Sequence, residues 1–274
     1  MTGAAIRVAV AGSGGRMGQT LIDAVLSDQG FVLAGALEVA DSPLLGRDPG
    51  ERVGRATGIA VTADIASGIH GADVLIDFTR PAATQAHLAA CAQAGVAAVI
   101  GTTGVSETDK HSLARFADSV PIVFAPNMSV GVNVLAKLVE MAAQRLGDDY
   151  DIEIVEMHHR HKVDAPSGTA VLLGEVAAAA LGRDLESNGV YSRQGVTGER
   201  PARAIGFATL RGGDVVGEHT VIFAGAGERV EISHKATSRM NFARGALRAA
   251  DFVAARHAEG KTGLYDMQDV LGLR

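Results

Sequence analysis

Basic and imidazole side chains gather in one short stretch near the middle of the chain. Three histidines, His158, His159 and His161, fall within four residues. Two cations, Arg160 and Lys162, stand among them. A histidine among cations should have a lowered pKa, which a bound dicarboxylate would raise again. The stretch therefore predicts a pocket for an anionic substrate in which a histidine acts as the general acid.

The residues that follow predict the start of a helix. In Pro166-Ser167-Gly168-Thr169 the serine is placed to cap the helix. The first backbone N–H groups of a helix form a ready anion site. We therefore expect Gly168 and Thr169 to form a carboxylate site that the nearby cations face.

Two simpler explanations of the histidine stretch stay open. Clustered histidines can bind a metal, but this spacing offers no three ligands on one face, and Arg160 and Lys162 would repel a cation. The stretch could also be a solvated loop, although its position between a strand and a helix argues against that. We expect no metal site.

A glycine-rich turn near the N-terminus predicts a dinucleotide site. Gly12, Gly15 and Gly18 have the spacing G-x-x-G-x-x-G, with Gly14 in addition, which departs from the usual G-x-G-x-x-G. Glycines there let the chain turn sharply and let the backbone approach a pyrophosphate at a helix N-terminus. Glu38 lies twenty residues after Gly18, where a carboxylate can accept hydrogen bonds from a ribose hydroxyl.

The residues around Glu38 also bear on which dinucleotide is used. A carboxylate at the ribose repels a 2′-phosphate, which favours NADH over NADPH. Val39 follows where an arginine would help to hold that phosphate, so Arg16 is the nearest basic candidate. We expect the cofactor to be NADH or NADPH, with NADH used at least as well.

The first half of the chain predicts the scaffold for the glycine turn. Short aliphatic runs alternate with helical stretches, which is typical of a parallel sheet covered on both faces. The expected strands are Ile6–Ala11, Phe31–Glu38, Asp73–Phe78, Ala97–Gly101 and Pro121–Ala125. The fold class is therefore α/β, beginning with a doubly wound, Rossmann-type parallel sheet.

The pattern changes after an expected helix at Val130–Leu146. Asp151–Glu156 alternates between acidic and apolar residues, as in a strand with one face in water. Further strands are expected at Ala202–Leu210, Val215–Phe223 and Arg229–Ser233, and further helices at Ser167–Leu181 and Ser238–His257. This region predicts a second, α+β domain with a mixed or antiparallel sheet. We expect a dinucleotide-binding domain at 1–129 and 239–274, and a substrate-binding and oligomerisation domain at 130–238.

Composition excludes several other classes of protein. The net charge of −6 and the pI of about 5.8 do not suit a nucleic-acid binder. The single cysteine, Cys91, allows no intrachain disulfide, and we expect it to be a small buried side chain. We also expect no signal peptide, because the first strand begins at Ile6, and no membrane span. The expected location is cytoplasmic.

Several motifs together resemble one enzyme family. The most specific is E-M-H-H-R-H-K-V-D-A-P-S-G-T at Glu156–Thr169. In the first half of the chain, others are V-A-G-S-G-G-R-M-G at Val10–Gly18, D-F-T-R-P at Asp77–Pro81 and G-T-T-G at Gly101–Gly104. Further along they are A-P-N-M-S-V-G-V-N at Ala125–Asn133 and I-G-F-A-T-L-R-G-G-D-V-V-G-E-H-T at Ile205–Thr220. In order and spacing they resemble the 4-hydroxy-tetrahydrodipicolinate reductase (dihydrodipicolinate reductase) family of lysine and diaminopimelate biosynthesis.

The resemblance implies roles for the matching residues. His158 is similar to the family's proton donor, and Lys162 to a second catalytic residue that assists from the substrate side. His159, Gly168 and Thr169 resemble the ligands of the substrate carboxylates. The implied cofactor positions are Gly12, Ser13, Gly14, Gly15, Arg16, Met17, Glu38, Gly101, Thr102, Thr103, Ala125, Pro126, Asn127 and Met128. Val39 is a departure, since some members carry arginine there.

The implied reaction is hydride transfer from the nicotinamide to a cyclic dicarboxylate that loses water, with a proton from His158. The resemblance also implies a homotetramer. Two alternatives stay open: another NAD-dependent imine or amino-acid dehydrogenase, and a regulator that senses NADH without chemistry. The sensor would have no use for the cationic stretch.

Overall fold

The computed structural model describes residues 4–274, which divide into two compact units. The first unit runs to Val130 and resumes at Arg239–Arg274, and the second is Gly131–Ser238. Each boundary lies within one residue of the expected domain limits. The two units are described separately below.

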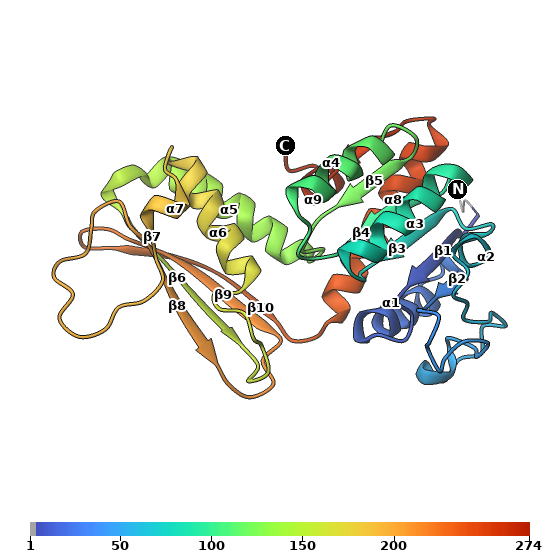
Figure 1. Ribbon diagram of the computed structural model, residues 1–274. Helices are drawn as coiled ribbons and strands as arrows, with labels where there is room; N and C mark the ends of the chain where they lie inside the picture. The colour runs from blue at the N-terminus through green and yellow to red at the C-terminus, as the bar shows by residue number, and fades with distance from the viewer. Residues whose placement is uncertain (1–3) are drawn as a thin grey trace. The chain divides into compact units, whose positions relative to one another are not determined.

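The first unit contains a six-stranded sheet in which every strand is parallel to its neighbours (Figure 1). The strand order is β11-β5-β4-β3-β1-β2. The strands are β1 Ile6–Ala11, β2 Phe31–Leu37, β3 Val74–Asp77, β4 Ala97–Ile100, β5 Pro121–Phe124 and β11 Gly263–Tyr265. The helices are α1 Arg16–Ser27, α2 Ile65–Ile69, α3 Pro81–Ala94, α4 Glu107–Phe116, α8 Met240–Ala258 and α9 Met267–Leu271, with a 3₁₀ turn at Glu51–Val53. The doubly wound parallel sheet expected from the sequence is confirmed.

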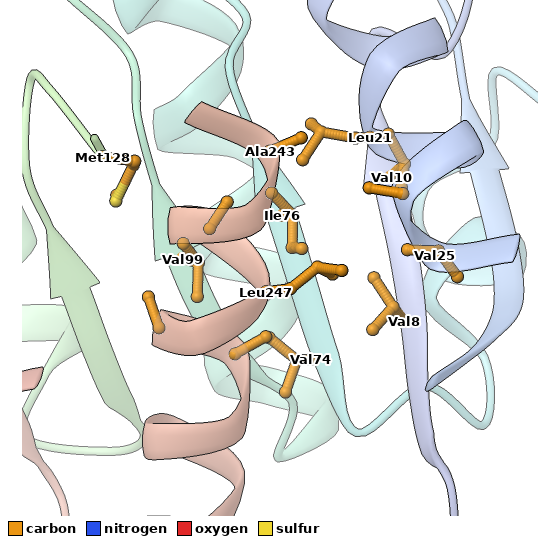
Figure 2. Close-up of a cluster of buried hydrophobic side chains, with 14 of the residues drawn as sticks. Val8, Val10, Leu21, Val25, Val74, Ile76, Val99, Met128, Ala243 and Leu247 are labelled. Atoms are coloured by element: carbon orange, nitrogen blue, oxygen red, sulfur yellow. The ribbon is translucent and has the colours of Figure 1, made fainter. Parts of the chain in front are cut away.

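Both faces of this sheet are covered, which explains the nearly continuous apolar strands. Alternate residues of a strand point to opposite faces. Val8 and Val10 of β1 pack with Leu247 of α8 on one face (Figure 2). Ala9 and its neighbours pack on the other, in a cluster that includes Cys91 of α3. The order of the strands reverses between β1 and β3, so the loops after these two strands flank the expected ligand crevice.

The second unit contains a five-stranded mixed sheet in the order β10-β9-β6-β8-β7. Its strands are β6 Asp151–His158, β7 Gly189–Val190, β8 Ile205–Arg211, β9 Gly217–Ala224 and β10 Arg229–Ala236. β8 is parallel to β6 and β7, whereas β9 is antiparallel to β6 and β10. Three helices, α5 Val130–Leu146, α6 Gly168–Ala180 and α7 Leu185–Asn188, lie on one face of the sheet (Figure 1). Their contact with the sheet forms the second core, in which Leu173 of α6 packs with Ile154 and Phe223.

Candidate active site

The glycine turn lies where β1 passes into α1, and its geometry demands glycine at two positions. Gly12 has a φ of +67°, in the left-handed region that side chains rarely adopt. A Cβ on Gly18 would lie 2.0 Å from the Gly12 carbonyl oxygen, so a side chain there would force the loop apart. Gly15 precedes the first residue of α1, which places the helix N-terminus beside the loop. This arrangement suits the close approach of a phosphate.

Glu38 lies against this loop, directly after β2. Its Oε1 accepts a hydrogen bond from the Gly14 N–H at 2.7 Å, and its Oε2 accepts one from the Val39 N–H at 3.1 Å. On the opposite side of the loop, the Arg52 guanidinium donates to the Gly14 carbonyl oxygen at 2.9 Å. The predicted ribose carboxylate and the predicted phosphate loop are therefore in direct contact.

A cavity of about 760 Å³ opens beside Glu38 at the reversal point between β1 and β3. Its lining includes Gly12, Gly15, Glu38, Val39, Thr79 and Arg80. Such a volume is ordinary for a cofactor pocket. Val39 is 62% exposed at its rim, which leaves room for a larger side chain.

A buried carboxylate that the sequence analysis did not single out shapes one wall of this cavity. Asp77, at the end of β3, accepts hydrogen bonds from the Thr79 N–H at 2.7 Å and the Thr79 hydroxyl at 2.6 Å. His87 of α3, which also lines the cavity, pairs with Asp77 through Nδ1 at 2.8 Å. Burial would raise the pKa of Asp77, but the hydrogen bonds from His87 and Thr79 outweigh it and lower that pKa. Thr79 in turn packs against Gly12, where a Cβ would lie 2.9 Å from its methyl group.

The other two predicted cofactor segments follow β4 and β5, at the same edge of the sheet. Gly101 packs under Phe78, and a Cβ on it would lie 2.4 Å from that ring. The Thr102 hydroxyl is buried and bonded to Thr84 at 2.8 Å. Met128 is fully buried, so its side chain belongs to the core. In these segments Thr103 and Pro126 are exposed, Asn127 is half-buried, and Ala125 is buried.

In the second unit, His158 is the last residue of β6 and only 8% exposed. Its Nδ1 lies 2.6 Å from Glu156 Oε2, and its ring meets the His219 ring edge-on with centroids 5.1 Å apart. Burial lowers the pKa of His158; Glu156 opposes this effect, and the charges of Lys162 and Arg211 add to it. The lowered pKa keeps His158 neutral over a wider pH range than a free histidine, and a bound anion would raise that pKa again.

Glu156 corrects one expectation about β6. The acidic residues of this strand were expected to face water, yet Glu156 is only 1% exposed and shares the helix-covered face with Ile154 and His158. The buried and half-buried positions alternate regularly along β6, but the sequence has two apolar residues in a row, Ile154 and Val155. The next acidic residue, Glu156, therefore falls on the buried face. Arg211 of β8 binds its two oxygens at 2.8 and 2.9 Å. Burial alone would raise the pKa of Glu156, but the hydrogen bonds from Arg211 and His158 lower it.

Ser167 caps α6, as the sequence predicted. The start of this helix lies beside Glu156. The Ser167 hydroxyl accepts a hydrogen bond from the Ala170 N–H at 3.2 Å and is bonded to His219 Nε2 at 3.0 Å. The Ser167 N–H donates to Glu156 Oε1 at 3.0 Å. Gly168 is exposed, and a Cβ on it would meet no atom within 4 Å. The helix start is therefore open on the side where Gly168 lies.

The remaining predicted substrate residues lie in the connection between β6 and α6. The side chain of Lys162 is mostly buried, and its Nζ lies 2.9 Å from Asp164 Oδ1. The His159 N–H donates to the Val215 carbonyl oxygen at 2.7 Å. Its ring Nδ1 is buried without a hydrogen-bond partner among the residues that the structure describes. Lys162 is close enough to lower the pKa of both His158 and His219.

The structure adds Glu156, Arg211 and His219 to the predicted set of this unit. Arg211 and His219 come from β8 and β9, which pair with β6 across long stretches of sequence. Both residues stand in motifs that carry the family resemblance, which is the one signal that could have drawn attention to them. Within residues 4–274, no three His, Cys, Asp or Glu side chains gather closely enough to hold a metal ion. Nor does any helix in that range have the length and apolar character to cross a membrane.

Comparison with known proteins covers nearly the whole chain. Residues 6–128 match the family described as "Dihydrodipicolinate reductase, N-terminus", and residues 131–271 match "Dihydrodipicolinate reductase, C-terminus". The 4-hydroxy-tetrahydrodipicolinate reductases of Dechloromonas aromatica and Cupriavidus taiwanensis are 59% and 58% identical to it. Each alignment covers 98% of this chain, and 99% and 100% of the relative. A dipicolinate-bound dihydrodipicolinate reductase from Paenisporosarcina sp. TG-14 has a similar structure, with a TM-score of 0.74 at 25% identity, covering 97% of this chain and 98% of the other.

Proposed function

The chain belongs to the dihydrodipicolinate reductase family, and we propose that it reduces 4-hydroxy-tetrahydrodipicolinate to tetrahydrodipicolinate with NAD(P)H. This reaction serves lysine and diaminopimelate biosynthesis. The observation that carries the proposal is the placement of His158, which is buried beside the open start of α6 and among cations. A proton donor next to an anion site is what reduction of a dicarboxylate requires.

We assign cofactor binding to the first unit. The close approaches at Gly12 and Gly18 leave no room for side chains where a pyrophosphate would lie, and Glu38 is in place for a ribose hydroxyl. When bound, the reduced nicotinamide supplies a hydride to the substrate. The proposed contacts are Gly12–Met17, Glu38, Gly101–Thr103 and Ala125–Met128. Because Thr102 and Met128 are buried, we expect these two to contribute through their backbones.

We assign substrate binding and proton transfer to the second unit. His158 donates the proton, Lys162 assists as the second catalytic residue, and His159, Gly168 and Thr169 hold the carboxylates. Substrate, NAD(P)H and one proton give the product, NAD(P)⁺ and water. A bound carboxylate would compete with Asp164 for Lys162, because Asp164 pairs with that amine. The dipicolinate held by the Paenisporosarcina relative carries two carboxylates and supports a site of this charge.

The assembly and location are part of the same proposal. We propose a homotetramer in which the second unit provides the contact between subunits. The face of its sheet opposite the helices presents apolar side chains that are exposed or half-buried, among them Val155, Leu210 and Ile222. Sheet faces of this kind are usual in subunit interfaces. A cytoplasmic location agrees with the single, reduced and buried Cys91.

The test is a coupled assay. The preceding synthase, supplied with pyruvate and aspartate semialdehyde, generates the substrate while NADH or NADPH oxidation is followed by absorbance. We expect rapid oxidation by the wild type and a loss of about 10²-fold or more in His158→Ala, the range for a general acid. NADH affinity should barely change in that variant. His257→Ala, which alters an exposed histidine at the end of α8, is the matched control.

Two other outcomes would point to the alternatives. Oxidation with a different imine or amino acid, and none with this substrate, would indicate another dehydrogenase on the same scaffold. NADH binding without oxidation of any substrate in the panel would indicate a sensor. Loss of NADH binding in His158→Ala would contradict the role assigned to this residue.

A further inference from the structure

The pairing of Glu156 with His158 is built into strand β6. The two residues are two positions apart, and such residues point to the same face of a strand. That face is covered by helices, so both side chains are buried. The 2.6 Å contact joins Glu156 Oε2 to the ring Nδ1 of His158.

We propose that Glu156 is a positioning residue for proton transfer. Held by Arg211, its carboxylate keeps His158 in the Nδ1–H tautomer. Nε2 is then the nitrogen that exchanges the proton with the substrate. The inference rests on the proposed role of His158 as proton donor. The inference adds Glu156 and Arg211 to the site as residues that act through His158 and do not contact the substrate or the cofactor themselves.

The hydrogen bonds determine which nitrogen of His158 carries the fixed proton. An ionised carboxylate only accepts hydrogen bonds, so the proton between Glu156 and His158 belongs to Nδ1. Nε2 has no hydrogen-bond partner within residues 4–274. Gly217, the first residue of β9, lies beside Nε2, and a Cβ there would lie 2.9 Å from it. The fold therefore leaves Nε2 as the nitrogen available to a ligand.

Glu156 stays ionised because its two oxygens are fully engaged. Oε1 accepts from the Ser167 N–H and Arg211, and Oε2 accepts from His158 and Arg211. The bidentate contact with arginine is the strongest geometry for a carboxylate. A protonated Glu156 would lose at least one of these bonds. The direction of its pKa, which is lowered, agrees with this.

The same carboxylate also connects the proton donor to the proposed anion site. Its Oε1 holds the N–H of Ser167, the capping residue of α6, whose next residue is Gly168. Arg211 also donates to the Asp164 carbonyl oxygen at 2.6 Å, which fixes the connection that leads into the helix. Glu156 therefore sets the position of the ring of His158 relative to the helix start. Productive geometry at such a site must hold to a fraction of an ångström.

The first measurement needs no variant. ¹⁵N spectra of histidine-labelled wild-type protein, with His158 assigned from His158→Ala, report the tautomer of the neutral ring. We expect protonated Nδ1 and bare Nε2 in His158. A neutral His158 with its proton on Nε2 would overturn the proposal. This result is independent of enzyme activity, so it remains decisive if the wild type oxidises no NADH with the substrate, an outcome that would refute the proposed function instead.

The second measurement separates positioning from mere structural support. In Glu156→Gln we expect kcat/KM at neutral pH to fall about 10²-fold, while the NADH dissociation constant stays within about twofold. Glu156 raises the pKa of His158. Without its charge, the limb of the pH–rate profile that requires protonated His158 should therefore move to lower pH. A profile that keeps its shape and position while only the amount of folded enzyme falls would overturn the proposal.

The control is Asp148→Asn. Asp148 precedes β6, at the opposite end of the strand from His158, and pairs with the buried Arg183. Its substitution also removes a carboxylate from an arginine but should leave the pH–rate profile unchanged. In the His158→Ala background, Glu156→Gln should lower the residual rate less than about twofold, because it acts through the missing ring. A full further loss in the double variant would show that Glu156 acts by another route.

Discussion

Glu38 Oε1 accepts the Gly14 N–H at 2.7 Å, so the carboxylate after β2 and the loop after β1 are held as one piece. The Arg52 guanidinium donates to the Gly14 carbonyl oxygen, and the Val39 N–H donates to the second oxygen of Glu38. The carboxylate is thereby fixed at the wall of the 760 Å³ cavity. A ribose hydroxyl can donate to it there, whereas a 2′-phosphate would meet its negative charge.

This geometry predicts that NADH is used at least as well as NADPH and that Val39→Arg shifts the preference. An arginine at this exposed position can pair with a 2′-phosphate, and we expect kcat/KM for NADPH to rise about tenfold relative to NADH. The measurement is kcat/KM for both cofactors in the wild type and the variant. Val32→Arg, which adds the same charge at an exposed valine within β2, is the control. A wild type that strongly prefers NADPH would contradict the assignment of Glu38.

The arrangement of the proposed cofactor site could be predicted from the sequence because its signals are local. A strand, a glycine turn and a helix follow one another directly, and Glu38 lies at the end of the next strand. By contrast, β11 was missed because its three residues, Gly263–Tyr265, are too few to show a pattern. It joins the edge of the sheet through pairing with β5, which no local sequence records.

The arrangement of the proposed substrate site was only partly predictable. His158, Lys162 and the helix start at Gly168 stand in one continuous stretch, which is why they could be recognised together. Glu156 stands in the same stretch but looked like a solvent-facing residue of an alternating strand. The pairing of β6 with β8 places Arg211 opposite His158 in the register. Its contacts with Glu156, together with those of His158 and Ser167, offset the cost of burying this carboxylate.

A small change at Gly217 should impair the proton transfer. In Gly217→Ala the added methyl group would lie 2.9 Å from Nε2 of His158, so the ring must shift or Nε2 becomes crowded. We expect kcat to fall about tenfold or more, with NADH affinity unchanged, because a shift of about 1 Å suffices for such a loss. Steady-state kinetics with NADH titration measure both quantities. Gly212→Ala, whose methyl group would meet only the flexible end of Met157, should retain activity; equal losses in both would contradict the explanation.

Cys91 should be chemically inert in the folded protein. Its side chain is fully buried between α3 and the sheet, and burial raises the pKa of its thiol to about 12. Because the thiolate is the reactive form, we expect iodoacetamide at pH 8 to label the unfolded protein far faster than the folded one. Mass spectrometry over time measures both rates. Rapid labelling of the native protein would show that this part of the first unit opens readily.

The stability of the second unit should depend on pH through His219. Burial, with the charge of His158 next in size, lowers the pKa of His219 from 6.5 to about 4. Between these values the unfolded chain binds the proton and the folded chain does not, so stability is complete above pH 6.5 and falls as the pH decreases toward 4. The loss amounts to about 2 kcal/mol at pH 5 and about 3 kcal/mol at pH 4 or below.

In His219→Gln the free energy of urea unfolding should therefore decrease less between pH 7 and pH 5 than in the wild type, by about 2 kcal/mol. The comparison uses the change with pH within each protein, because the lost bond to Ser167 lowers the stability of the variant at every pH. His257→Gln, at an exposed site, should follow the wild-type curve; a His219→Gln curve parallel to it as well would mean that His219 takes up its proton without unfolding.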